Sequence, residues 1–132
     1  MTYLLDTNTC IRFINGRAPK IRERFSQVSD TDIVVSAITK AEMFTGSAKS
    51  KYPIRSREKQ DIFFSRFVSL PFDDRAAHEY GLIRAYLEIK GIPIGGYDLQ
   101  IASIAIVHNF IVVTHNIKEF SRIPNLNIED WE

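Results

Sequence analysis

The chain has 132 residues, of which 45% are hydrophobic and 25% are charged, and its formal net charge is +1. This length fits one domain over residues 1–132 with one core of ordinary size, and this balance of residues excludes an intrinsically disordered chain. The longest apolar runs are too short to span a bilayer, and Asp6 interrupts any secretory signal segment, so we expect a cytoplasmic protein. A single cysteine, Cys10, excludes an internal disulfide.

The amino-terminal residues predict a strand followed by a helix. The apolar run from Tyr3 to Leu5 is typical of a short strand that is buried on both faces. Apolar residues then recur at helical spacing between Thr7 and Gly16, and glycine is a common residue just past a helix end. Asp6 would therefore lie at the carboxyl end of a central strand, where open α/β sheets place their ligands. On this residue alone, a simple helix-capping role is an equally good interpretation.

Strands and helices alternate along the rest of the chain. Further strands are predicted at residues 33–36, 70–72, 110–114 and 126–128. Helices are predicted at residues 19–28, 37–48, 62–68, 73–91 and 98–107, with a helical turn at 119–120, and the basic segment 49–57 is expected to be a loop or the corner of a helical hairpin. This alternation predicts an α/β fold, a three-layer α/β/α sandwich with a mostly parallel central sheet.

Four acidic residues fall where a parallel sheet would bring them together. Asp6, Glu42 and Glu119 follow strands, Asp98 begins a helix, and Asn116 adds a neutral oxygen at the same edge. Carboxylates that lie close together repel one another unless a cation or protons offset their charge. Oxygen-only sites of this kind select hard cations such as Mg²⁺ or Mn²⁺, which activate water and stabilise the charge of a phosphodiester under attack.

Each of these acids also has an ordinary structural interpretation. Glu42 could close a capping box with Thr39, Asp98 could be a plain N-cap, and Glu119 could be a surface residue. The hypothesis of a metal site depends on the joint placement of the acids. It is also favoured because the chain contains no glycine-rich phosphate loop, no zinc-type Cys/His spacing and no nucleophile elbow.

Basic residues gather in the segment between residues 40 and 60. Six basic residues stand there against two acidic ones, which gives a local balance of +4. We hypothesise that a subset contacts the phosphates of an RNA, and the alternative is an ordinary solvated helix face. The candidate RNA-binding residues are Lys49, Lys51, Arg55, Arg57 and Lys59.

Four stretches carry a resemblance to a known family: LLDTNTCI, SAITKAEMFTGSAKS, GIPIGGYDLQIASIA and VVTHNIKEFSRIPNLNIEDW. Together they resemble the PIN-domain endoribonucleases, most closely the VapC toxins of bacterial type II toxin–antitoxin modules, over nearly the whole chain. The resemblance implies that Asp6, Glu42 and Asp98 occupy the three acidic metal-site positions of the family. It also implies that Thr7 and Thr114 supply hydroxyl groups that line the metal site.

The resemblance implies further properties that spacing does not reveal. These are RNA cleavage that depends on Mg²⁺ or Mn²⁺, a homodimer, and inhibition by a VapB-type antitoxin whose flexible segment lies across the groove. The DTNTCI and PIGGYD stretches resemble toxins that cut the anticodon loop of initiator tRNA, although Gly96 stands where that pattern has proline. Many PIN domains have a fourth acid where this chain has Asn116, and the nearest carboxylate is Glu119.

Other families that begin with an aspartate after the first strand fit less well. A haloacid dehalogenase would need a second aspartate two residues later, where this chain has Asn8, and the acid pair and lysine of a receiver domain are also missing. The remaining alternative is a PIN-like module that binds RNA or protein without cutting. The presence of all three acids, Asp6, Glu42 and Asp98, argues against that alternative.

Overall fold

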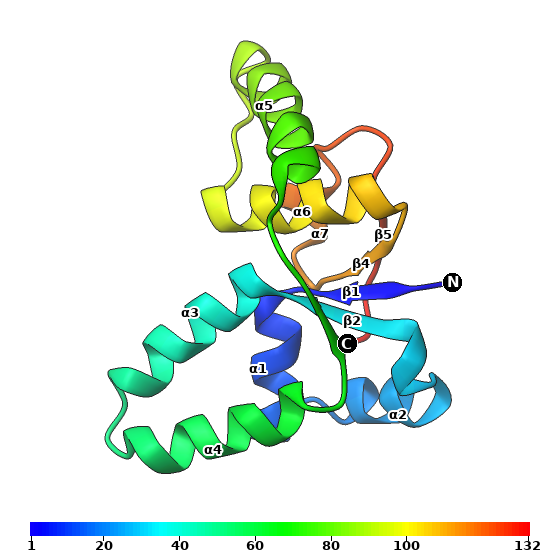
Figure 1. Cartoon of the computed structure of the whole chain (residues 1–132). Helices are drawn as coiled ribbons and strands as arrows, with labels where there is room; N and C mark the ends of the chain where they lie inside the picture. The colour runs from blue at the N-terminus through cyan, green and yellow to red at the C-terminus, as the bar shows by residue number, and fades with distance from the viewer.

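A computed structural model describes all 132 residues and shows a five-stranded sheet between two layers of helices (Figure 1). The strands lie in the order β3-β2-β1-β4-β5, and every neighbouring pair is parallel. The strands are β1 (Tyr3–Leu5), β2 (Ile33–Ser36), β3 (Val68–Leu70), β4 (Ile111–Val113) and β5 (Asn127–Glu129). The predicted three-layer α/β/α fold is thus confirmed, with a sheet that is parallel throughout.

The helices connect successive strands and cover both faces of the sheet (Figure 1). They are α1 (Thr7–Asn15), α2 (Pro19–Gln27), α3 (Ala37–Ala48), α4 (Pro53–Phe64), α5 (Asp74–Ile89), α6 (Gly96–His108) and α7 (Ile117–Phe120), with a short 3₁₀ helix, η1, at Asp30–Asp32. Helices α1, α2 and α4 lie on one face and α5 and α6 on the other, while α3 contacts both α1 and α6. None of these helices is both long and apolar enough to cross a membrane.

The alternation of side chains along the central strands divides the core into two clusters. Leu4 and Val112 pack with residues of α5 and α6, whereas the next residues along each strand, Leu5 and Val113, pack with residues of α1, α2 and α4 and with Trp131. All four strand residues are fully buried. Successive side chains of a strand point to opposite faces, so a short strand buried on both sides has to be apolar at every position. This double burial anchors β1 at the centre of the sheet and determines where Asp6 emerges.

The region after the basic segment differs from its prediction. Helix α4 begins at Pro53, so only residues 49–52 form the corner of a helical hairpin, within the segment 49–57 expected to be a loop or such a corner; α4 ends at Phe64, and Val68 belongs to β3. The strand predicted at 70–72 is therefore at Val68–Leu70, where Val68 pairs with Val34. The apolar spacing at 62–68 misled the prediction because Phe67 is buried from a turn and not from a helix. Pro53 starts α4 because proline is favoured at the first position of a helix.

Gly16 ends α1 in the left-handed conformation, with φ of 66°, and its N–H donates to the last carbonyls of the helix. We expect Gly16→Ala to lower the free energy of unfolding by about 1 kcal/mol, because a side chain disfavours this backbone conformation. Gly46→Ala is the matched control: Gly46 lies inside α3 and a Cβ there would meet no atom within 4 Å. This control should raise stability by roughly 0.5–1 kcal/mol. Urea unfolding of both variants checks the pair, and equal effects would contradict it.

Candidate active site

Asp6 sits at the junction of β1 and α1. Its N–H donates to the Val113 carbonyl at 3.0 Å, which continues the sheet pairing one residue beyond β1. Its carboxylate accepts the Thr9 N–H at 2.8 Å, so Asp6 does cap α1, and the side chain is only 3% exposed. Burial raises the pKa of Asp6, while hydrogen bonds from Thr114 and Thr9 oppose that rise. Asp6 therefore both caps α1 and lies buried in a polar site.

Glu42 is held towards Asp6 by a side chain from α1. The Thr7 hydroxyl donates to the Glu42 carboxylate at 2.7 Å and lies 3.1 Å from the Thr39 hydroxyl. The N-cap of α3 is Ser36, whose hydroxyl accepts the Thr39 N–H at 3.1 Å. The capping box considered for Glu42 is therefore absent, and this carboxylate faces α1 instead.

Asp98 enters the same site from the first turn of α6. The N-cap of α6 is Gly95 and no side chain caps it, so the simple capping interpretation of Asp98 is wrong. The pKa of Asp98 is raised from 3.8 to about 6, mainly by burial and then by the negative charges of Asp6, Glu42 and Glu119. Four carboxylates from four different parts of the chain thus lie close enough to repel one another.

Asn116 links two of these carboxylates. Its N–H donates to the Thr114 hydroxyl at 2.9 Å, and its side-chain amide donates to Glu119 at 3.0 Å. A hydrogen bond from the same amide to Asp98 favours the charged form of that carboxylate and lowers its pKa. Glu119 is half-buried, so it is part of a network and not a free surface residue. The structure thereby brings all five candidate catalytic residues to one edge of the sheet.

The donor set of this site matches a hard divalent cation. None of the ion pairs of the protein involves Asp6, Glu42, Asp98 or Glu119. The groups that hold these carboxylates in place are hydroxyls, amides and backbone N–H groups, which are neutral. Oxygen ligands with uncompensated negative charge are what Mg²⁺ and Mn²⁺ prefer. The residues present therefore fit the cation that the sequence predicted.

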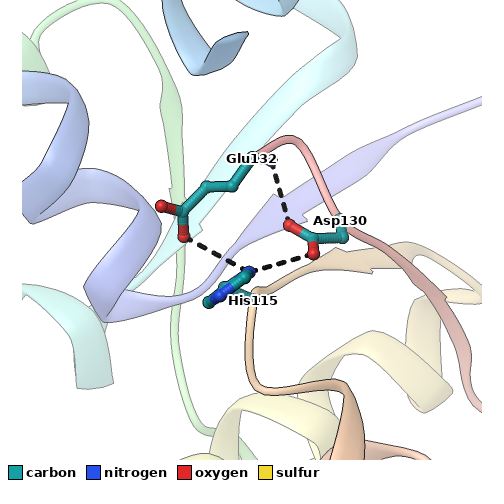
Figure 2. Close-up of side chains that lie close together, drawn as sticks. All are labelled: His115, Asp130 and Glu132. Carbon is teal, nitrogen blue, oxygen red and sulfur yellow. Dashed lines mark hydrogen bonds and ion pairs between the residues drawn. The ribbon is translucent and has the colours of Figure 1, made fainter. Parts of the chain in front are cut away.

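A second group of ionisable side chains lies at the carboxyl terminus (Figure 2). His115 Nδ1 is 3.0 Å from Asp130 and 3.6 Å from Glu132, and the three possible ligand atoms lie within 4.8 Å of one another. Arg12 also pairs with Glu132. The hydrogen bond with Asp130 and the charges of both acids raise the pKa of His115. Here Arg12 offsets part of the carboxylate charge, in contrast to the site at Asp6. The sequence analysis treated these terminal acids only as a charge asymmetry.

The five candidate RNA-binding residues do not all line one pocket. Lys51, Arg55 and Lys59 line a pocket of about 370 Å³ between α1 and the hairpin of α3 and α4. Arg57 pairs with Asp61 at 3.0 Å and covers the ring of Phe44. Lys49 ends α3 and is exposed outside that pocket. The structure thus groups three of the five cations.

This combination of a parallel α/β/α fold and an acidic edge site agrees with the comparisons. Residues 3–126 match the PIN domain family, to which the chain belongs. It is 43% identical over 131 residues to the tRNA(fMet)-specific endonuclease VapC of Salmonella typhimurium, with 99% of this chain and 98% of that protein covered. It is 42% identical over 133 residues to ribonuclease VapC2 of Rickettsia felis, with 100% and 99% covered. Within the PIN domains, the chain is thus a member of the VapC group.

Solved structures of this group share the whole fold. The crystal structure of VapBC2 from Rickettsia felis bound to a promoter DNA fragment matches with a TM-score of 0.93 and 42% identity, and it covers 100% of both chains. The DNA-bound VapBC structure from Salmonella typhimurium matches with a TM-score of 0.94 and 42% identity over 100% of this chain and 99% of that chain. The resemblance seen in the sequence is therefore confirmed at the level of the fold and the family.

The raised pKa of Asp98 predicts a pH-dependent loss of stability in the absence of divalent cations. The folded pKa of about 6 lies above the ordinary 3.8, so the charged form destabilises the fold. The penalty is absent below about pH 4, grows as the pH rises through 6, and is complete above that range. Asp98→Asn should remove it and raise stability at pH 7.5 by on the order of 1 kcal/mol, a value discounted because the carboxylate is partly exposed.

Melting temperatures in EDTA between pH 4 and pH 8 measure this effect. Asp32→Asn is the control, because Asp32 is exposed and forms no ion pair. The curves of the parent and of Asp98→Asn should converge at acidic pH and separate above it. Parallel curves for these two proteins would show that the pKa of Asp98 is not raised in the folded state.

Proposed function

We propose that this chain is the toxin of a VapBC-type module and acts in the cytoplasm as a metal-dependent endoribonuclease. The observation that supports this most directly is the meeting of Asp6, Glu42, Asp98 and Glu119 without any paired cation. Such a site has little structural benefit by itself, because uncompensated carboxylates destabilise a fold. A divalent ion bound at this site, beside a phosphodiester, would offset the charge of the carboxylates.

In this proposal Asp6, Glu42 and Asp98 hold Mg²⁺ or Mn²⁺ through carboxylate oxygens. The ion supplies Lewis-acid activation of water and offsets the charge that develops on the scissile phosphate. Thr7 orients Glu42 through its hydrogen bond, and the backbone N–H of Thr9 does the same for Asp6. These neutral contacts orient the carboxylates and leave their charge available to the ion.

Asn116 and Glu119 have positioning roles in this proposal. The Asn116 amide contacts both Asp98 and Glu119, so it relates the two carboxylates to each other. It also lines a shallow cavity together with Asn8 and Arg12 of α1, where a phosphate oxygen or water could be held. Glu119 either orients this amide or supports a second ion, and the two roles predict different metal dependence.

For the substrate we favour structured RNA, with the anticodon loop of initiator tRNA first. The relatives in Salmonella typhimurium and Shigella flexneri, at 43% and 37% identity, are named tRNA(fMet)-specific endonucleases. The cations around the 370 Å³ pocket offer phosphate contacts on the side of α1 next to the site. The target remains a proposal about this chain.

For partners we propose a VapB-type antitoxin and a second copy of the chain. The matching structures from Rickettsia felis, Salmonella typhimurium and Haemophilus influenzae are VapBC complexes, at 36–42% identity. An antitoxin segment that crosses the acidic edge could offset its charge with an arginine, since none of the protein's own cations pairs with these four carboxylates. Co-expression with a cognate VapB-type antitoxin should then suppress toxicity.

The decisive test of the enzyme assignment uses Asp98→Asn. RNA cleavage with Mg²⁺ or Mn²⁺ should fall by about a hundredfold or more, because a charged metal ligand is lost at nearly constant volume. Mapping of new RNA 5′ ends after expression in a bacterial host measures it, and it also identifies the substrate. Asp32→Asn should cut as the parent does. Full activity of Asp98→Asn would overturn the assignment, and a parent that binds RNA without cutting would support the alternative of a non-catalytic module.

Metal titration of three further variants separates the roles at the fourth position. If a second ion uses Glu119, Glu119→Gln should lose activity at limiting Mn²⁺ and recover in part at high Mn²⁺. Asn116→Ala should lose activity that added metal does not restore, because the amide orients its neighbours. Asn116→Asp should tighten metal binding through an added charge. A Glu119→Gln curve that overlays the parent's would favour a single ion.

A further inference from the structure

Three possible metal ligands from two separate segments converge outside the acidic edge site (Figure 2). His115 follows β4, and Asp130 and Glu132 follow β5. The His115 Nδ1 atom lies 3.0 Å from Asp130 Oδ2 and 3.6 Å from Glu132 Oε2, and the three atoms lie within 4.8 Å of one another. Ligand atoms that share one metal ion at about 2.0–2.2 Å are roughly 3–4 Å apart. The spacings around Nδ1 therefore suit a shared ion.

One oxygen of each carboxylate is held by the protein, and the other oxygen is turned towards the histidine. Asp130 Oδ1 accepts the Glu132 N–H at 2.9 Å, and Glu132 Oε1 pairs with Arg12. The remaining oxygens, Asp130 Oδ2 and Glu132 Oε2, are the two that approach Nδ1 of His115. Carboxylates that bind metal ions are commonly oriented by such outer partners, which leave one oxygen for the ion.

A buried tryptophan fixes the place of both acids. Trp131 lies between them in the chain and is only 3% exposed, and its ring packs against Tyr3 at 5.2 Å and Phe25 at 5.5 Å between ring centres. Its indole N–H donates to Glu129 at 3.0 Å. Because the residue between them is anchored in the core, the two acids are brought to His115 before any ion binds. A site that is organised in advance loses less entropy on binding.

The charges of this group leave room for a cation. Arg12 offsets one carboxylate, and the other pairs only with His115. The hydrogen bond with Asp130 and the charges of Glu132 and Asp130 raise the pKa of His115, so a proton on the imidazole holds the group together in the absence of metal. A metal ion replaces such a proton, because imidazole binds metal in its neutral form. His115 and Glu132 also line the shallow cavity of about 570 Å³, which gives an ion access and space for water ligands.

We propose that His115, Asp130 and Glu132 bind a divalent transition-metal ion of the Zn²⁺ or Co²⁺ class, at a site separate from the acidic edge. Nδ1, Oδ2 and Oε2 are the three protein ligands, and water from the cavity completes the coordination. An imidazole ligand favours this class of ion, whereas Mg²⁺ prefers oxygen ligands alone. The bound ion ties the carboxyl-terminal residues to the loop that carries Asn116. This inference does not depend on the proposed ribonuclease function.

Trp131 is the only tryptophan of the chain and lies between two of the ligands, so its fluorescence reports on this site. The full chain is titrated with Co²⁺, which quenches a nearby indole, in the presence of excess Mg²⁺. The parent should show saturable quenching by one Co²⁺ per chain, and added Zn²⁺ should reverse it. His115→Gln and Asp130→Asn should each weaken binding by at least about tenfold. His78→Gln should bind as the parent does, because His78 is an exposed histidine of α5 outside this group.

The same titration of Asp98→Asn distinguishes this site from the acidic edge. Quenching that persists in Asp98→Asn and is lost in His115→Gln supports the proposal. Quenching that is lost in Asp98→Asn and kept in His115→Gln places the ion at the acidic edge and overturns it. Calorimetry with Zn²⁺ is the second measurement, and a parent that binds neither Zn²⁺ nor Co²⁺ also overturns the proposal. The side chain of His115 is 66% exposed, so His115→Gln should melt in EDTA at the temperature of the parent.

Discussion

Like-charge repulsion among four carboxylates is the constraint on which this structure depends. Parallel pairing places the ends of β1, β2 and β4 on one edge of the sheet, and α6 begins beside that edge with Asp98 in its first turn. The acids come from separate elements, so the fold as a whole brings them together. The doubly buried strand β1 holds Asp6 in place through apolar burial on both faces of the sheet.

The carboxylates of the site are held by neutral hydrogen-bond donors, which leave their negative charge without a paired cation. Thr7 donates to Glu42, and the backbone N–H of Thr9 donates to Asp6. A lysine or arginine at any of these places would stabilise the isolated fold more, but it would compete with a divalent ion for the same oxygens. Threonine at these positions is therefore consistent with a site whose negative charge is offset by a bound divalent ion.

Much of this arrangement could be predicted from the sequence, because strands of three or four apolar residues followed by a polar residue are clear signals. The bounds of α3 and the place of Asp6 follow directly from such patterns. The region of Phe67 and Val68 could not be predicted, since burial from a turn imitates helical spacing. The Thr7–Glu42 contact joins residues far apart in the chain, and no local pattern encodes it.

The carboxyl terminus shows how the protein confines negative charge to the place where it is used. Glu132 is near enough for its charge to raise the pKa of Asp6, so the terminal acids add to the repulsion at the site. Arg12 and His115 pair with Glu132, and His115 also pairs with Asp130. Neither Arg12 nor His115 forms an ion pair with Asp6, Glu42, Asp98 or Glu119, so these residues offset the terminal charge without supplying an internal counter-ion to Asp98. The uncompensated charge is therefore restricted to the edge where the strands end.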